Sequence, residues 1–183
     1  MTNATRIDSI GLIGLGMMGS GMAANILKAG LPLIVCDIDE TKNHQLEALG
    51  ATVAQGPADV ARQARVVITM VDTTAQSEEV TVAAGGIIDG AQAGDAVICM
   101  STVDPVVVKQ MGETLAEKQI GMIDAPVSGM IKGANEGTLR AFVGGDGATV
   151  ELCRRALEPM TSEIIHVGEL GQGLVMKLIN NMM

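Results

Sequence analysis

The chain has 183 residues with 12 basic and 21 acidic side chains, a net charge of −9, and 48% hydrophobic residues, which fits one domain, or one domain and a fragment, with a full core. The acidic balance and the near lack of aromatic residues (one Phe, no Tyr, no Trp) exclude a nucleic-acid-binding surface, because phosphates need a basic face and single strands need stacking platforms. No charge-free apolar run reaches the about 18 residues of a membrane span.

Short apolar runs alternate with longer amphipathic runs along the chain, and the alternation predicts parallel βαβ units in an α/β fold with a doubly wound, mostly parallel sheet. The predicted elements in chain order are strand 9–15, helix 18–29, strand 32–36, helices 41–49 and 57–63, strand 66–71, helix 75–82, strand 96–100, helix 105–118, strands 122–124 and 139–144, helix 149–160, strand 164–167 and helix 173–183.

The last predicted helix has no stop signal. Its apolar residues Leu178, Ile179, Met182 and Met183 have no downstream partner in the sequence. We therefore expect the chain to be a piece of something longer; the alternative is a helix that frays or packs on another subunit.

A glycine-rich loop with the pattern G-x-G-x-x-G lies between the first predicted strand and helix. Gly14 permits a tight turn, Gly16 leaves room for a pyrophosphate, and Gly19 lets the helix pack close to the strand. Free N–H groups at the start of the helix face the phosphates. The residues between these glycines, also expected at the cofactor, are Leu15, Met17 and Met18.

Asp37 ends the second predicted strand, 18 residues after Gly19, where a carboxylate binds the hydroxyls of the adenosine ribose. A 2′-phosphate would be repelled by Asp37 and by Asp39. The sequence therefore predicts NAD as the cofactor, with NADP disfavoured.

Four segments in order resemble the β-hydroxyacid dehydrogenases, a family that includes 3-hydroxyisobutyrate dehydrogenase and tartronate semialdehyde reductase. The first is the loop and helix at 11–30, and the second is S-T-V-D-P at 101–105. The third is D-A-P-V-S-G at 124–129, and the fourth is G-x-G-x-x-x-K-x-x-x-N at 171–181. The resemblance covers almost the whole chain.

The resemblance implies a Rossmann-type NAD-binding domain over residues 1–168. Residues 169–183 would then begin a long interdomain helix that leads to an absent all-helical C-terminal domain. That domain closes the substrate site and forms dimers in the family, so the complete protein is expected to be a homo-oligomer.

The implied reaction is the reversible oxidation of a short 3-hydroxy carboxylic acid to its aldehyde or ketone. The resemblance assigns the general acid/base to Lys177. A free lysine has a pKa of about 10.4, which burial or a positive nicotinamide would lower. Asn181 lies one helical turn further on the same face and is expected to orient the hydroxyl or the lysine.

The substrate carboxylate is expected at Ser128 and at the backbone N–H groups of Gly129 and Met130. Asn180 is a weaker candidate for substrate contact, and Thr102 is expected near the nicotinamide; its alternative role is a cap for the helix at 105.

Two positions depart from the family pattern. Met130 stands where the family has a second glycine, which leaves the substrate open, and Lys132 could add charge for a di-acid or remain solvated. Val71-Asp72 replaces a Leu-Pro pair beside the adenine ribose, although Val71 is still expected at the cofactor.

Metal chemistry is not indicated, since His44 is expected to be solvated and His166 structural. Cys36, Cys99 and Cys153 have no C-x-x-C spacing and predict reduced thiols; with no export signal at residues 1–8, they favour the cytoplasm.

Two alternatives to the dehydrogenase function remain: a dinucleotide-sensing domain without chemistry, and an imine reductase on the same scaffold. Relatives of the second kind generally lack the lysine.

Overall fold

The computed structural model describes residues 8–182. The N-terminal segment 1–7, where no export signal is predicted, and the apolar Met183 lie outside the described residues. Within residues 8–182, no helix is both long and apolar enough to cross a membrane.

The centre of the described structure is a single sheet with the order β3-β2-β1-β4-β5-β6-β8-β7, and β9 pairs with β8. The pairs from β3 to β6 are parallel, whereas β8 runs antiparallel to β6 and β7. The strands are β1 (Ile10–Ile13), β2 (Leu33–Cys36), β3 (Thr52–Val53), β4 (Val66–Thr69), β5 (Ala96–Cys99), β6 (Gly121–Asp124), β7 (Val127–Ser128), β8 (Leu139–Gly144) and β9 (Thr161–Gly168).

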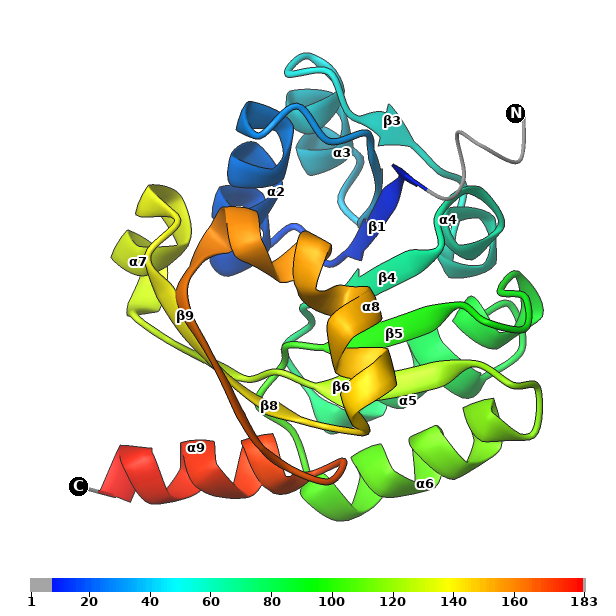
Figure 1. Ribbon diagram of the computed structural model, residues 1–183. Coiled ribbons are helices and arrows are strands. Elements are labelled where there is room, and N and C mark those ends of the chain that lie inside the picture. Colours follow the sequence, from blue (N-terminus) through cyan, green and yellow to red (C-terminus); the bar gives the residue numbers. More distant parts are fainter. Residues whose placement is uncertain (1–7, 183) are drawn as a thin grey trace.

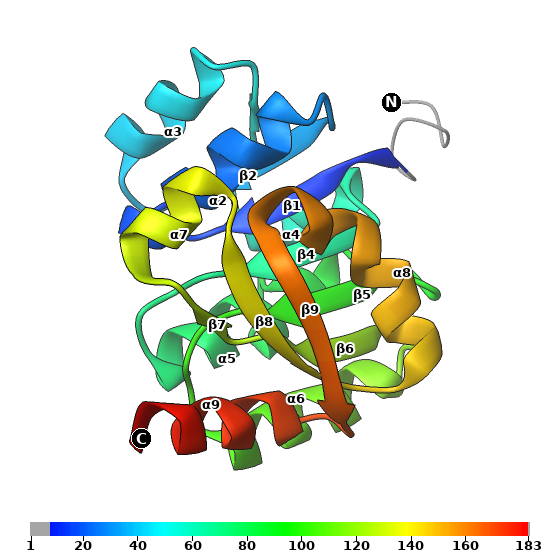
Figure 2. The ribbon, with the colours of Figure 1, turned by 60° about the vertical axis from the view of Figure 1, so that its left-hand side comes forward.

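Helices cover both faces of the sheet, and Figure 1 shows α8 in front of β5 and β6. In Figure 2, α7 lies beside α2, and α9 lies beside α6 at the lower edge. The helices are α2 (Met17–Lys28), α3 (Glu40–Glu47), α4 (Pro57–Gln63), α5 (Thr74–Val82), η1 (Ile87–Asp89), α6 (Pro105–Ala116), α7 (Met130–Glu136), α8 (Gly147–Leu157), η2 (Glu158–Met160) and α9 (Gln172–Met182).

Successive strand residues enter two separate hydrophobic cores, because side chains alternate across a strand. Leu12 and Ile68 face the core under α2, α3, α7 and α8. Ile13 and Val67 face the core under α4 and α6. This two-sided burial explains why the parallel strands are apolar at nearly every position, and it confirms the predicted doubly wound α/β architecture.

The largest difference from the prediction is in residues 127–136, where no strand or helix was predicted and the structure has β7 and α7. This segment has no apolar period of its own; β7 forms because β8 offers it an antiparallel partner. The predicted strand 66–71 ends at Thr69, which pairs with the last residue of β1. The predicted helix 149–160 begins earlier, because Asp146 caps it, and becomes a 3-10 turn at Glu158–Met160, which contains Pro159.

Candidate active site

The glycines of the phosphate loop lie at close backbone approaches. Gly14 has φ +94°, and a side chain there would overlap the carbonyl oxygen of Met70. A Cβ at Gly19 would overlap the carbonyl oxygen of Gly14, so the first turn of α2 packs directly on the end of β1. Gly16, the N-cap of α2, has open space on its Cβ side and gives the helix no side-chain cap. The loop therefore presents uncapped N–H groups to an open space, which suits an anion.

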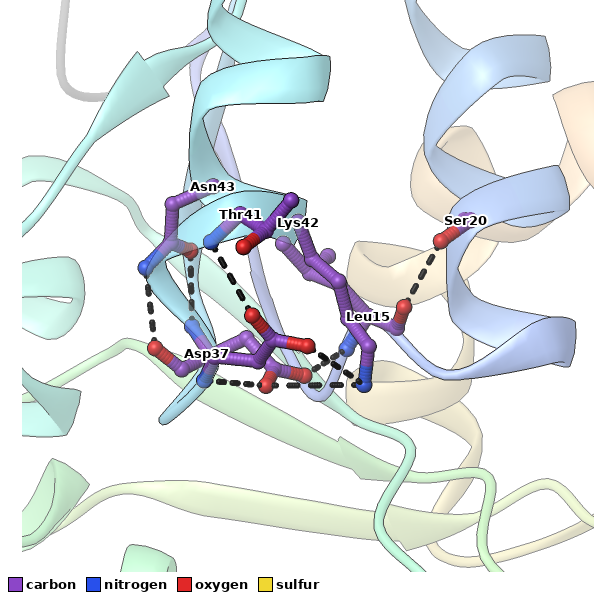
Figure 3. A network of polar contacts seen from close by, with 7 residues as sticks. Leu15, Ser20, Asp37, Thr41, Lys42 and Asn43 are labelled. Atoms are coloured by element: carbon purple, nitrogen blue, oxygen red, sulfur yellow. Dashed lines mark hydrogen bonds and ion pairs between the residues drawn. The ribbon is translucent and has the colours of Figure 1, made fainter.

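The carboxylate of Asp37 ties the phosphate loop to the end of β2 (Figure 3). The N–H of Leu15 donates to Asp37 Oδ2 at 2.6 Å, and the N–H of Asp39 donates to Oδ1 at 2.8 Å. Lys42 Nζ lies 3.8 Å from Asp37 Oδ1 and 3.9 Å from Asp39 Oδ2. The turn thus holds two acids and one lysine at the position predicted for the ribose.

Asn43 holds the backbone of Asp37 from both sides, a role that was not predicted from the sequence. Its Oδ1 accepts from the N–H of Asp37 at 2.9 Å, and its Nδ2 donates to the carbonyl oxygen of Asp37 at 2.9 Å (Figure 3). The residue is 7% exposed. The only sequence signal was a polar residue on the buried side of a short helix, which by itself does not identify a partner.

Val71 and Thr102 follow β4 and β5 at the same edge of the sheet as the phosphate loop, as the carboxyl ends of parallel strands must. Val71 lies beside Gly14, since a Cβ on that glycine would be 3.1 Å from Val71 Cγ1. The N–H of Val71 donates to Ser101 Oγ at 2.8 Å. Thr102 is exposed, and the cap of α6 is Asp104, so the alternative capping role for Thr102 is wrong.

The predicted substrate loop connects β7 to α7. Ser128 is half-buried in β7, and Gly129 follows with φ +133°. Met130 has φ +56° and is 82% exposed, so a bulky residue occupies the left-handed region at this position. Lys132 is exposed and lies 4.0 Å from Glu136, which agrees with a solvated lysine.

The substrate loop is joined to the phosphate-loop helix through Asn25. Its Nδ2 donates to the carbonyl oxygen of Ala134 in α7 at 2.7 Å. A Cβ at Gly21 of α2 would lie 2.5 Å from Asn135 Oδ1, so the two helices meet at backbone distance. Neither contact could be inferred from spacing, because the partners are more than 100 positions apart in the chain.

Lys177, Asn180 and Asn181 all lie on α9, with Lys177 and Asn181 one turn apart. Lys177 is half-buried, and burial lowers the pKa of its ammonium below the usual 10.5. Within residues 8–182, no hydrogen bond or ion pair engages this ammonium. The exposed apolar residues of the same helix are Val175, Met176, Leu178, Ile179 and Met182.

The start of α9 is held by the fully buried Asp124 at the end of β6. The N–H of Gly171 donates to Asp124 Oδ1 at 2.6 Å, and the N–H of Leu174 donates to Oδ2 at 2.7 Å. Burial raises the pKa of Asp124, and these two hydrogen bonds lower it in part. The third and fourth motifs of the sequence are therefore in direct contact.

The surroundings of the histidines and cysteines are those of structural or solvent-exposed residues. His44 is exposed beside Glu47, and the ring of His166 contacts the carbonyl oxygens of Gly145 and Gly168. All three cysteines are free, and burial raises the pKa of both Cys99 and Cys153 to about 12. In the described part of the chain, no three His, Cys, Asp or Glu residues gather at a metal-binding distance.

The predicted site residues thus form three groups. The phosphate loop, Asp37 and Val71 are in contact. The open space beside Gly16 fits the pyrophosphate of a dinucleotide, and the acidic turn at Asp37 fits its adenosine ribose. The loop of Ser128 to Met130 is tied to this group through Asn25. Lys177 is tied to the start of the substrate motif through Asp124, and in residues 8–182 no hydrogen bond joins it to Ser128 or Thr102.

Residues 9–168 match the family described as the NAD binding domain of 6-phosphogluconate dehydrogenase. The chain is 36% identical over 174 residues to a probable mitochondrial 3-hydroxyisobutyrate dehydrogenase of Dictyostelium discoideum and 36% identical to the 2-(hydroxymethyl)glutarate dehydrogenase of Eubacterium barkeri. Both matches cover 95% of this chain but 54% and 58% of the relatives. The structure of Mycobacterium tuberculosis 3-hydroxyisobutyrate dehydrogenase with L-serine matches at a TM-score of 0.87 and 32% identity, over 96% of this chain and 59% of that one.

Proposed function

This chain belongs to the β-hydroxyacid dehydrogenase family and forms its NAD-binding part, and from this premise we propose that the whole protein oxidises a short 3-hydroxy carboxylic acid with NAD. The observation that carries the proposal is Lys177, a half-buried lysine with a lowered pKa and no acidic partner in the described residues. A lysine that is partly desolvated and has no acidic partner gives up its proton more readily, which suits a general acid/base.

The cofactor would be held by the phosphate loop and Asp37. Uncapped N–H groups of α2 would face the pyrophosphate across the open side of Gly16, and Asp37 would accept from the ribose hydroxyls. A bound nicotinamide supplies the acceptor for the hydride of the substrate carbon. Since Asp37 and Asp39 outweigh Lys42 in charge, the turn disfavours a 2′-phosphate, and NAD is preferred to NADP.

Lys177 would move the proton. In the oxidation its neutral amine accepts the proton of the substrate hydroxyl, and in the reduction its ammonium donates a proton to the carbonyl oxygen. Burial assists the first role, because it makes the neutral amine available at a lower pH. Asn181, one turn further on α9, would orient the hydroxyl or the lysine.

The substrate carboxylate would bind at Ser128 and the N–H groups of Gly129 and Met130. Asn180 and Thr102 are further candidates for contacts at the substrate and the nicotinamide. Since the relatives named above act on 3-hydroxyisobutyrate and on 2-(hydroxymethyl)glutarate, the first substrates to test are this mono-acid and this di-acid. The exposed Met130 is the side chain that would distinguish them.

The decisive test is Lys177→Ala in the complete protein, with NAD and both hydroxy acids. We expect turnover to fall by at least about 100-fold, since general acid–base groups contribute about 10²- to 10⁴-fold. The control is Lys28→Ala, at the exposed end of α2. Unchanged turnover in Lys177→Ala would refute the proposal.

Calorimetric titration and a substrate panel separate the alternatives. A sensing domain would bind NAD with no turnover on any hydroxy acid, whereas an imine reductase would act on cyclic imines and leave hydroxy acids unchanged. Lys177, which has no acidic partner within residues 8–182, favours the hydroxy acids. A hydroxyl needs a base to accept its proton, whereas an imine nitrogen is itself basic.

The organisation of the complete protein is also a proposal. We assign residues 1–168 to the cofactor domain and 169–183 to the start of a helix that leads to an all-helical domain in a homo-oligomer. Three free thiols are consistent with the cytoplasm, and the Dictyostelium relative is named as mitochondrial, so fractionation of the source cells is the test.

A further inference from the structure

Asp124 is a buried carboxyl group that the proposed chemistry does not use. It is the last residue of β6 and the first residue of the D-A-P-V-S-G motif, and it is 0% exposed. Burying a carboxylate is costly unless its oxygens are hydrogen-bonded, so the partners of this side chain indicate what it does.

Both oxygens accept from the N-terminal region of α9. Oδ1 accepts from Gly171 at 2.6 Å and Oδ2 from Leu174 at 2.7 Å, across 47 and 50 positions of the chain. Asp124 therefore acts as an N-terminal cap supplied by a distant strand rather than by the residue before the helix.

Glycines make room for this contact. A Cβ at Gly173 would lie 2.8 Å from Asp124 Oδ2 and would overlap the carbonyl oxygen of Phe142, and a Cβ at Gly144 would overlap Asp124 Oδ1. Gly173 thus lets the helix approach the carboxylate at backbone distance, whereas Gly171 has φ +89°, so the two glycines of the fourth motif have different physical reasons.

The contact fixes where Lys177 lies. Leu174, whose N–H is held by Asp124, is three residues before Lys177, or about 4.5 Å along the helix axis at about 1.5 Å per residue. In the other direction, Asp124 is four residues before Ser128, at the end of the strand that leads into the substrate loop. One carboxylate therefore connects the strand of the carboxylate-binding loop to the helix of the acid/base.

We propose that Asp124 is a positioning residue: its carboxylate sets the axial height and rotation of α9, and so places the Lys177 amine relative to the substrate loop. This inference rests on the proposed function, because it assigns Asp124 a role only through Lys177.

The test is Asp124→Asn in the complete protein. Asparagine keeps the shape, but one of its two terminal atoms becomes a donor, so one of the two N–H groups loses its acceptor. We expect kcat to fall about 10- to 100-fold, as for a misplacement of about 1 Å, while the Kd for NAD changes less than about twofold. The matched control is Asp146→Asn, because Asp146 caps α8 through Ala148 and Thr149, and α8 carries none of the predicted site residues.

A second variant keeps the inference testable if Asp124→Asn does not fold. Gly171→Ala leaves the carboxylate intact but strains its donor, which has φ +89°; the added Cβ would lie 2.9 Å from Cε of Lys109 and 3.3 Å from the carbonyl oxygen of Pro105. It should lower kcat with unchanged NAD affinity, as Asp124→Asn does.

The outcomes are distinct from those that test the proposed function. An active Asp124→Asn or Gly171→Ala beside an inactive Lys177→Ala refutes the positioning role and leaves the function standing. Parallel losses of kcat and NAD affinity also refute it, because they indicate general disruption. An active Lys177→Ala overturns the function itself.

Discussion

Asn43→Ala tests whether the turn of Asp37 is preorganised for the cofactor. The substitution removes two hydrogen bonds of 2.9 Å to the backbone of Asp37 at a residue that is 7% exposed. A hydrogen bond contributes about 0.5–1.5 kcal/mol net, so the free energy of unfolding should fall by about 1–3 kcal/mol.

The same change should weaken NAD binding. Asp37 accepts from Leu15 of the phosphate loop. Without the two hydrogen bonds from Asn43, the turn of Asp37 must be ordered again when the ribose binds. An ordering cost of about 1–2 kcal/mol corresponds to about 5- to 30-fold weaker binding.

Urea unfolding and calorimetric titration of the chain measure the two effects. The control is Gln45→Ala, because Gln45 is an amide on the same helix and is exposed. If Asn43→Ala matched Gln45→Ala in both stability and NAD affinity, the clamp would have no role and the reasoning would be wrong.

Three further predictions concern packing, pH and thiol reactivity. Gly19→Ala places a Cβ onto a backbone carbonyl oxygen and should lower the free energy of unfolding by about 1–3 kcal/mol, whereas Gly56→Ala, in open space with an extended φ, should have little effect in urea unfolding. Because burial lowers the pKa of Lys177, the oxidation rate should rise with pH through a midpoint below 10.5 and the reduction rate should fall; a flat profile between pH 6 and 10.5 would contradict this assignment. Burial raises the pKa of Cys99 and Cys153 to about 12, so a thiol reagent such as Ellman's should leave both unmodified until urea unfolds the chain, and rapid reaction in the native state would contradict their burial.

Local patterns in the sequence predicted most of the sheet. Each parallel strand from β1 to β6 except the two-residue β3 corresponds to a short apolar run, because burial on both faces leaves a continuous apolar signal. The segment of β7 and α7 was missed, since its structure depends on pairing with β8 and on the contact of Asn25 with Ala134.

The class of fold, the phosphate loop and the acid at the end of β2 could be predicted from local patterns, because tight turns, glycine spacing and apolar runs are local requirements of the backbone. The hydrogen bonds of Asn43 to the turn of Asp37 and of Asp124 to the helix of Lys177 became visible only in the folded chain. A hydrogen bond between distant segments needs two suitable groups and a fold that brings them together. It imposes no period or spacing on the residues between them, so it leaves no pattern in the sequence.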